Sequence, residues 1–174
     1  ENFDAGPADD YHAKGGELNV THVQMQYPIS EAYIDAAVSV GIPRNDDING
    51  ETQEGIGYVQ VNMKGGKRWS SADAFLSAEV KRRPNLTIVT HAVAKRILLE
   101  GKKAVGIEYQ DKKGNTHQAT ANREVVLSAG TYNTPPLLEL SGIGSPDVLA
   151  GLGIEPQHEL RGVGENLQDH LQVW

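Results

Sequence analysis

A short apolar run that leads through a glycine into a proline-marked helix start limits most strongly how this chain can fold. The run Val125–Ala129 predicts a buried strand. After Gly130, Thr134 fits the N-cap of a helix, and Pro135 fits its first turn because a proline there loses no hydrogen bond. A strand, a glycine turn and a helix start form the geometry that brings backbone N–H groups close to a nucleotide. An ordinary strand–helix unit explains the Thr-Pro pair, but not the Ser-Gly-Ile-Gly of residues 141–144.

The composition is typical of a globular chain that handles small molecules. The formal net charge of −7 argues against a nucleic-acid partner, because phosphate binding needs a clustered basic face. The chain has no cysteine, and its 6 histidines lack zinc-type spacing, so we expect no metal site. No run approaches the roughly 20 apolar residues of a membrane span, and no signal peptide is recognisable. We expect a cytoplasmic location, with membrane association of a full-length protein left open.

Apolar alternation, caps and turn residues predict an α+β fold of antiparallel β-hairpins with a few helices. One helix should begin at Ser30 and end at Gly41, and a second should run from a capping box at Ser70 to Pro84. A further short helix should follow Ser145, in addition to the one that starts at Thr134. Strands are predicted at residues 18–20, 58–63, 86–90, 94–99, 105–109 and 116–121. The strands after residue 86 favour hairpins over parallel βαβ units.

Residues 130–144 resemble the second signature of the glucose-methanol-choline (GMC) family of flavin oxidoreductases. Four more stretches resemble the same family and follow the family's order. They are Tyr11 to Val20, Arg68 to Leu76, Arg83 to Leu98, and Gly162 to His170. The second of them is similar to a helix start in the bacterial alcohol- and choline-dehydrogenase branch. The resemblance covers nearly the whole chain, but only the middle part of such an enzyme.

The resemblance implies three parts: residues 1–85 from the substrate domain, 86–144 from the FAD domain, and 145–174 as a return into the substrate domain. The family's pyrophosphate-binding Gly-x-Gly-x-x-Gly is absent, since Gly162-Val163-Gly164 supplies only two of its glycines. The family's catalytic histidine would lie beyond Trp174, so we expect no catalytic residue in this chain. The chain opens at Glu1 without a methionine and stops as an apolar segment begins, and we expect both ends to be cuts.

Four positions in this chain are implied as ligand contacts by the resemblance. Ala94 occupies the strand position whose backbone amide and carbonyl contact the adenine of FAD, where valine is usual. Ala129 and Gly130 match the Ala-Gly beside the adenosine ribose, where a missing side chain allows close approach. Gln172 stands where choline-acting relatives carry a glutamate that faces the quaternary ammonium. A neutral side chain cannot balance a buried cation, so Gln172 favours an uncharged alcohol, although Trp174 could offer an aromatic face instead.

The resemblance implies an FAD-dependent oxidoreductase that oxidises a primary alcohol to the aldehyde by hydride transfer to the flavin. This chain would be a fragment of it, and inactive alone. A choline dehydrogenase of the same family is the first alternative. A free-standing, non-catalytic β-rich binding module is an alternative from another class. The sequence leaves open the oligomeric state and whether oxygen or a quinone-like carrier accepts the electrons.

Overall fold

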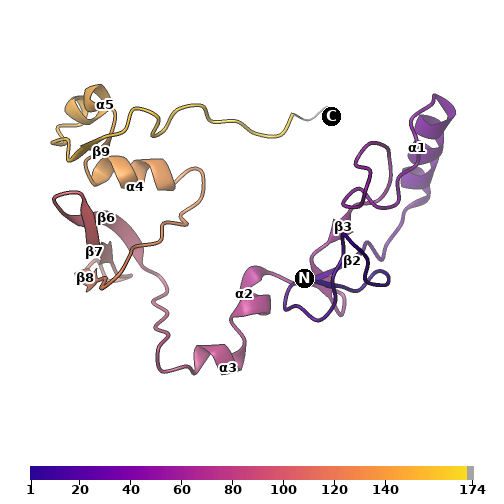
Figure 1. Cartoon of the computed structure of the whole chain (residues 1–174), viewed down its shortest axis with the longest axis horizontal. Helices are drawn as coiled ribbons and strands as arrows, with labels where there is room; N and C mark the ends of the chain where they lie inside the picture. Colours follow the sequence, from indigo (N-terminus) through magenta and orange to yellow (C-terminus); the bar gives the residue numbers. More distant parts are fainter. Residues whose placement is uncertain (172–174) are drawn as a thin grey trace. The chain divides into compact units, whose positions relative to one another are not determined.

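The computed structural model describes residues 1–171 and divides into two compact units. Glu1–Ile88 form the first unit, and the second begins at Val89. Both units combine short, mainly antiparallel sheets with a few helices (Figure 1), so the predicted α+β class is confirmed. Among the described residues, no helix has the length and apolar character that crossing a bilayer requires.

The first unit is organised around a three-stranded sheet of β1 (Asn2–Phe3), β2 (Asn19–His22) and β3 (Gln60–Val61). Strand β2 lies between the other two, parallel to β1 and antiparallel to β3. A hairpin of β4 (Met63–Lys64) and β5 (Lys67–Arg68) follows, with its turn at residues 65–66. Both turn glycines have positive φ, 57° and 74°, which explains the predicted turn. Phe3 and Ile34 contribute to the small core of this unit.

The helices of the first unit differ from prediction at their ends. Helix α1 (Pro28–Ser39) starts two residues before Ser30, because Pro28 is already suited to the first helical position. Helix α2 (Ser71–Phe75) has the predicted capping box at Ser70. It ends at Phe75 instead of continuing to Pro84, and α3 (Ala78–Lys81) follows it. The break occurs because the Ser77 hydroxyl accepts a hydrogen bond from the N–H of Val80 at 3.2 Å and starts a new helix.

The second unit contains the predicted hairpins. Strands β6 (Val93–Glu100), β7 (Lys103–Gln110) and β8 (Thr116–Thr120) form an antiparallel meander in chain order. Helix α4 (Thr134–Leu140) packs against β6. A parallel pair of β9 (Ile143–Gly144) and β10 (His158–Glu159) follows, with α5 (Pro146–Gly151) between them in the chain. The side chains of Ile97, Leu137 and Leu149 are buried in this unit.

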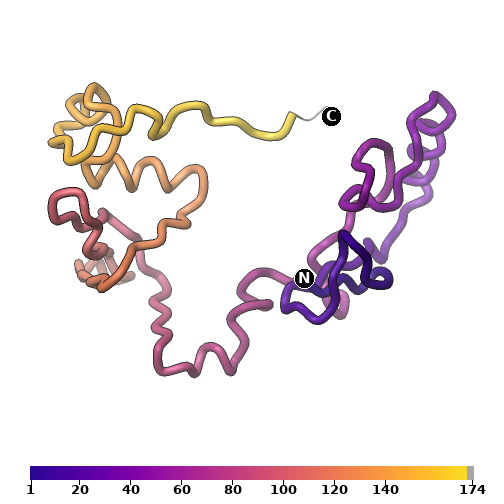
Figure 2. The backbone as a smooth tube through the Cα atoms, viewed as in Figure 1, coloured from indigo at the N-terminus to yellow at the C-terminus, as the bar shows by residue number. Residues whose placement is uncertain are grey.

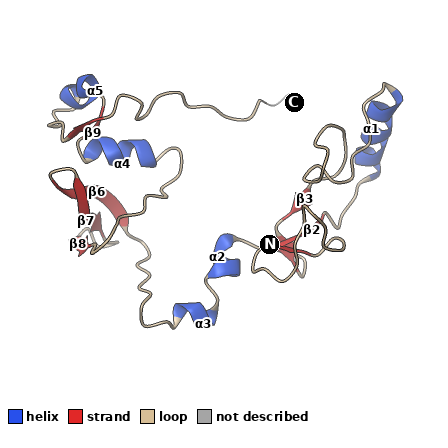
Figure 3. Ribbon diagram, in the orientation of Figure 1, coloured by secondary structure: helices blue, strands red, loops and turns tan. Residues whose placement is uncertain are grey.

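Two runs that were predicted as strands are irregular in the structure. Residues 86–90 and 125–129 are drawn as loop in Figure 3 and follow open paths in Figure 2. Val89 is 55% exposed and Val126 77% exposed, so the expected burial of the second run is also wrong. A strand needs a neighbour for its N–H and C=O groups. Within residues 1–171 neither run has such a neighbour.

Candidate functional site

The candidate site lies where β6 and α4 pack together, because these two elements carry the predicted contact residues. Ala94 is exposed near the start of β6. Ala129 is half-buried, and Gly130 is exposed in the turn before α4. The structure therefore brings together the two elements that the sequence analysis selected separately.

Strand β6 contains a bulge directly after Ala94. Ala94 is paired with Tyr109 of β7, whereas Arg96 is paired with the next residue along β7, Glu108. Lys95 is therefore the extra residue of β6 at this point. A bulge changes which residues of a strand direct their polar groups toward the neighbouring strand.

The direction of the Ala94 backbone follows from this bulge. The N–H of Ile97 points away from β7, since it donates a hydrogen bond to the hydroxyl of Ser141 in the segment after α4. In an antiparallel pair, successive residues alternate between facing the partner strand and facing away. Once the bulge is counted, Ala94 also directs its N–H and C=O away from β7. In a regular register Lys95 would do so instead. This orientation fits a backbone that contacts a planar base.

Gly130 has the conformation and the space that a close ligand contact needs. Its φ is 81°, a region that disfavours residues with a side chain. Among the described residues, no heavy atom lies within 4 Å of the position a Cβ would take. Its carbonyl oxygen accepts a hydrogen bond from the N–H of Thr134 at 2.9 Å, which closes the turn into α4. The open side of Gly130 fits the approach of a ribose.

The start of α4 differs from the sequence prediction. Its N-cap is Asn133, so Thr134 is the first helical residue. The N–H groups of Asn133 and Thr134 both donate to the carbonyl of Gly130, at 3.3 and 2.9 Å. Pro135–Pro136 have no N–H, and the N–H of Leu137 bonds the carbonyl of Asn133 at 3.2 Å. The expected presentation of N–H groups to a nucleotide by this helix is therefore wrong.

Ser141 joins α4 to β6. Its hydroxyl accepts a hydrogen bond from the N–H of Ile97 at 2.7 Å and donates one to the carbonyl of Leu137 at 2.6 Å. The Ser141 side chain is only 7% exposed. The sequence alone did not predict this bridge. A serine at the end of an otherwise apolar helix is the signal that could have suggested it, because buried hydroxyls need partners.

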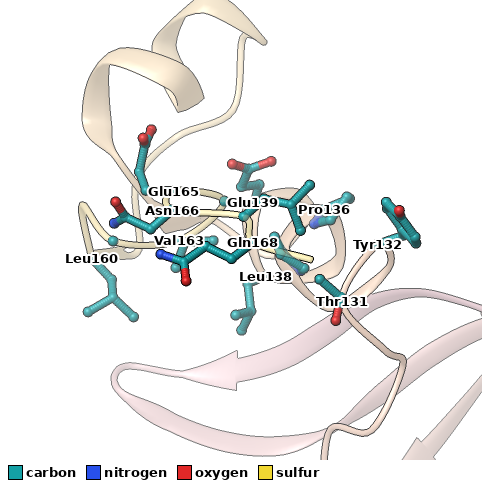
Figure 4. Close-up of a pocket in the computed structure, with 14 residues that line it drawn as sticks. Thr131, Tyr132, Pro136, Leu138, Glu139, Leu160, Val163, Glu165, Asn166 and Gln168 are labelled. Carbon is teal, nitrogen blue, oxygen red and sulfur yellow. The ribbon is translucent and has the colours of Figure 1, made fainter. Parts of the chain in front are cut away.

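A groove of about 1060 Å³ runs between α4 and the returning segment 160–168 (Figure 4). The turn at residues 162–164 forms one wall, with Val163 buried and Gly164 at a φ of 79°. A Cβ on Gly164 would lie 3.2 Å from the Oε1 of Glu139 on α4. The lining of the groove combines apolar side chains with the carboxylates of Glu139 and Glu165 and the amide of Gln168.

A second polar cluster lies in the first unit, around His12. The ring of His12 is 5% exposed and stacks on Phe3 with 3.9 Å between centroids. Its Nε2 lies 2.9 Å from Oδ2 of Asp47, and its Nδ1 lies 3.3 Å from Oε1 of Glu1. The hydrogen bond to Asp47 raises the pKa of His12 against the opposing effect of burial. Burial alone would raise the pKa of Asp47, but hydrogen bonds from His12 and Gln60 lower it.

The predicted substrate contact, Gln172, lies outside the described residues. The same applies to Trp174. Within residues 1–171, no group of three or more histidine and acidic side chains is arranged to hold a metal ion.

The chain is similar to known oxidoreductases in both sequence and structure. The chain is 47% identical over 166 residues to an alcohol dehydrogenase (acceptor) of Pseudomonas putida, covering 94% of this chain and 30% of the relative. It is 44% identical to the mitochondrial choline dehydrogenase of Mus musculus, covering 96% of this chain and 28% of that protein. An FAD-dependent oxidoreductase from Chaetomium thermophilum superposes with a TM-score of 0.86 at 29% identity, over 97% of this chain and 31% of that one.

The chain thus spans about a third or less of the length of these relatives, with 28% and 30% of the two dehydrogenases covered. The model of the GMC oxidoreductase family matches residues 5–172. This match takes in both units, the bulged strand β6 and the helix α4. The chain belongs to the GMC oxidoreductase family.

Proposed function

We propose that this chain is the central part of an FAD-dependent oxidoreductase that oxidises a primary alcohol to the aldehyde. The family match over residues 5–172 carries this proposal. The relatives named as alcohol and choline dehydrogenases and the FAD-dependent structural neighbour support it. We propose further that residues 1–85 and 145–174 belong to the substrate domain and 86–144 to the FAD domain. For the full-length protein we propose a cytoplasmic location.

The cofactor contacts that we propose use backbone more than side chains. Ala94 would contact the adenine through the N–H and C=O that the bulge directs away from β7. Ala129 and Gly130 would lie beside the adenosine ribose, where Gly130 has open space. When bound, FAD supplies the acceptor for a hydride from the carbinol carbon. The residues of this chain would hold the adenosine end and leave proton transfer to groups outside it.

For the substrate we propose a neutral primary alcohol, aliphatic or aromatic, in preference to choline. Gln172 supports this preference, because it is neutral where a carboxylate would balance a quaternary ammonium. A buried cation without a partner is costly, so choline should bind and react less well. Choline dehydrogenase activity is the alternative, and the mouse relative favours it.

Steady-state kinetics of the full-length protein with an artificial electron acceptor test this proposal. The kcat/KM should be at least about tenfold higher for octanol or benzyl alcohol than for choline. Gln172→Glu should raise the kcat/KM for choline and leave that for neutral alcohols nearly unchanged. Gln168→Glu, which adds the same charge four residues earlier, is the matched control. A wild-type preference for choline would contradict the role given to Gln172.

A non-catalytic binding module is the other class of function. An unrelated module would not be expected to match the GMC oxidoreductase model over nearly its whole length. A full-length protein that purifies without flavin and oxidises no alcohol would favour this alternative.

A further inference from the structure

Ser141 fixes the part of β6 that the proposed adenine contact uses. Its hydroxyl bonds the N–H of Ile97, three residues along β6 from Ala94. The N–H of Ile97 and the backbone groups of Ala94 lie on the same edge of the strand, the one that β7 does not cover. On this edge, the N–H of Ile97 bonds to Ser141 within the chain, whereas the backbone groups of Ala94 are proposed to bond to the ligand.

The second hydrogen bond of Ser141 fixes the other half of the proposed adenosine site. The hydroxyl donates to the carbonyl of Leu137 on α4, and α4 begins at the turn that Gly130 forms. One buried hydroxyl thus connects β6, which carries Ala94, with the helix that follows Gly130. An open pocket of about 350 Å³ lies beside this connection, and residues of both β6 and α4 contribute to its lining.

We propose that Ser141 is a positioning residue that sets the spacing between the adenine contact at Ala94 and the ribose contact at Gly130. The inference rests on the proposed function, since it assumes that these residues hold the adenosine end of FAD. Removing the hydroxyl leaves the N–H of Ile97 and one acceptor of Leu137 without their partner in a buried place. Such groups are costly to leave unpaired, so the edge of β6 should shift or loosen.

The test compares two ligands that each represent one half of FAD. ADP and riboflavin are titrated into the full-length apoprotein, with wild type, Ser141→Ala and Ser145→Ala measured in parallel. Ser145 is the matched control because it is a half-buried N-cap in the same stretch that forms no side-chain capping bond in the described structure. The Kd for ADP should rise about tenfold in Ser141→Ala, while the Kd for riboflavin stays within about twofold. Ser145→Ala should change neither.

The outcomes separate this inference from the proposed function. If wild type binds neither ADP nor riboflavin, the proposed function is wrong. If wild type binds ADP and Ser141→Ala binds it equally well, the role of Ser141 is wrong and the proposed function stands. An equal rise in both dissociation constants would show a general structural role and also overturn the inference.

A second variant keeps the test decisive where Ser141→Ala does not fold. Ser141→Cys has nearly the same shape and a weaker hydrogen-bonding group. It should raise the Kd for ADP severalfold, without a matching change for riboflavin, and increase amide hydrogen exchange at Ile97. Unchanged ADP binding together with unchanged exchange at Ile97 would overturn the inference.

Discussion

His12 lies between the carboxylates of Glu1 and Asp47 with 5% of its surface exposed, so it is one of the groups that hold the segment carrying Asp47. Asp47 belongs to the loop between α1 and β3, and its Oδ1 also accepts a hydrogen bond from Gln60 of β3 at 2.7 Å. Three parts of the first unit, around Glu1, His12 and Asp47, therefore meet at one imidazole. Sequence spacing did not indicate this contact, since 35 residues separate His12 from Asp47.

The His12–Asp47 pair predicts a pH dependence of stability. The pKa of His12 is raised above 6.5 on folding, so its contribution is complete below pH 6.5 and is lost as the pH rises through the folded pKa. The pKa of Asp47 is lowered below 3.8, so its contribution is present above pH 3.8 and is lost as the pH falls through the folded pKa. The His12–Asp47 pair therefore stabilises the folded chain most between about pH 3.8 and pH 6.5.

Replacing His12 should remove this pH dependence. The thermal midpoint of His12→Gln should lie below that of wild type by several degrees near pH 5.5, and the gap should shrink by about pH 8.5, where an imidazole is neutral. Thermal unfolding followed by circular dichroism measures both values. His22→Gln is the control, because His22 is exposed in the same unit. A gap that stays constant with pH would show that only packing on Phe3 matters.

Among the elements, those whose partners are close in the chain were predictable. The β6–β7–β8 meander follows from alternating residues and from turns at glycines, of which Gly101 and Gly114 have positive φ. The runs 86–90 and 125–129 have similar apolar character but lack a neighbouring strand within residues 1–171. The residue pattern shows that a segment can form a strand. The strand forms only beside a neighbouring strand, and the pattern does not show which segment that is.

The close contact of β7 and β8 at Gly106 gives a prediction for the sheet. A Cβ on Gly106 would collide with the carbonyl oxygen of Ala119 on β8, a backbone atom that cannot rotate away. Gly106→Ala should therefore lower the free energy of unfolding by about 1–3 kcal/mol. Urea unfolding measures this change.

Gly151→Ala is the matched control for the sheet prediction. Gly151 is the last residue of α5, with no described heavy atom within 4 Å of a Cβ position. The change should raise the free energy of unfolding by about 0.4–1 kcal/mol, because alanine restricts the unfolded chain. If both variants unfolded at the same urea concentration, the steric argument for Gly106 would fail.

At the scale of the whole molecule, the sequence was sufficient to identify the family, but it did not predict how β6 and α4 are joined at the candidate site. Five stretches in the right order were enough for the family, and the match over residues 5–172 confirmed it. The bulge at Lys95 and the bridge at Ser141 were missed, because both depend on how distant segments pair. Ala94, Ala129, Gly130 and Gln172 stay predictions as ligand contacts. The large exposed apolar side chains, such as Ile29 and Val126 at 77% each, suit surfaces that a longer protein would cover.

The last prediction concerns the 174-residue chain expressed by itself. It carries the proposed adenosine contacts but no Gly-x-Gly-x-x-Gly to hold the pyrophosphate, and it covers only 30% of the Pseudomonas putida relative. Losing most of a cofactor's buried surface removes most of its affinity. The purified chain should therefore be colourless and inactive toward alcohols, whereas the full-length protein prepared in the same way should show flavin absorbance. Stoichiometric FAD in the isolated chain would mean that residues 1–174 hold far more of the cofactor than Ala94, Ala129 and Gly130 account for.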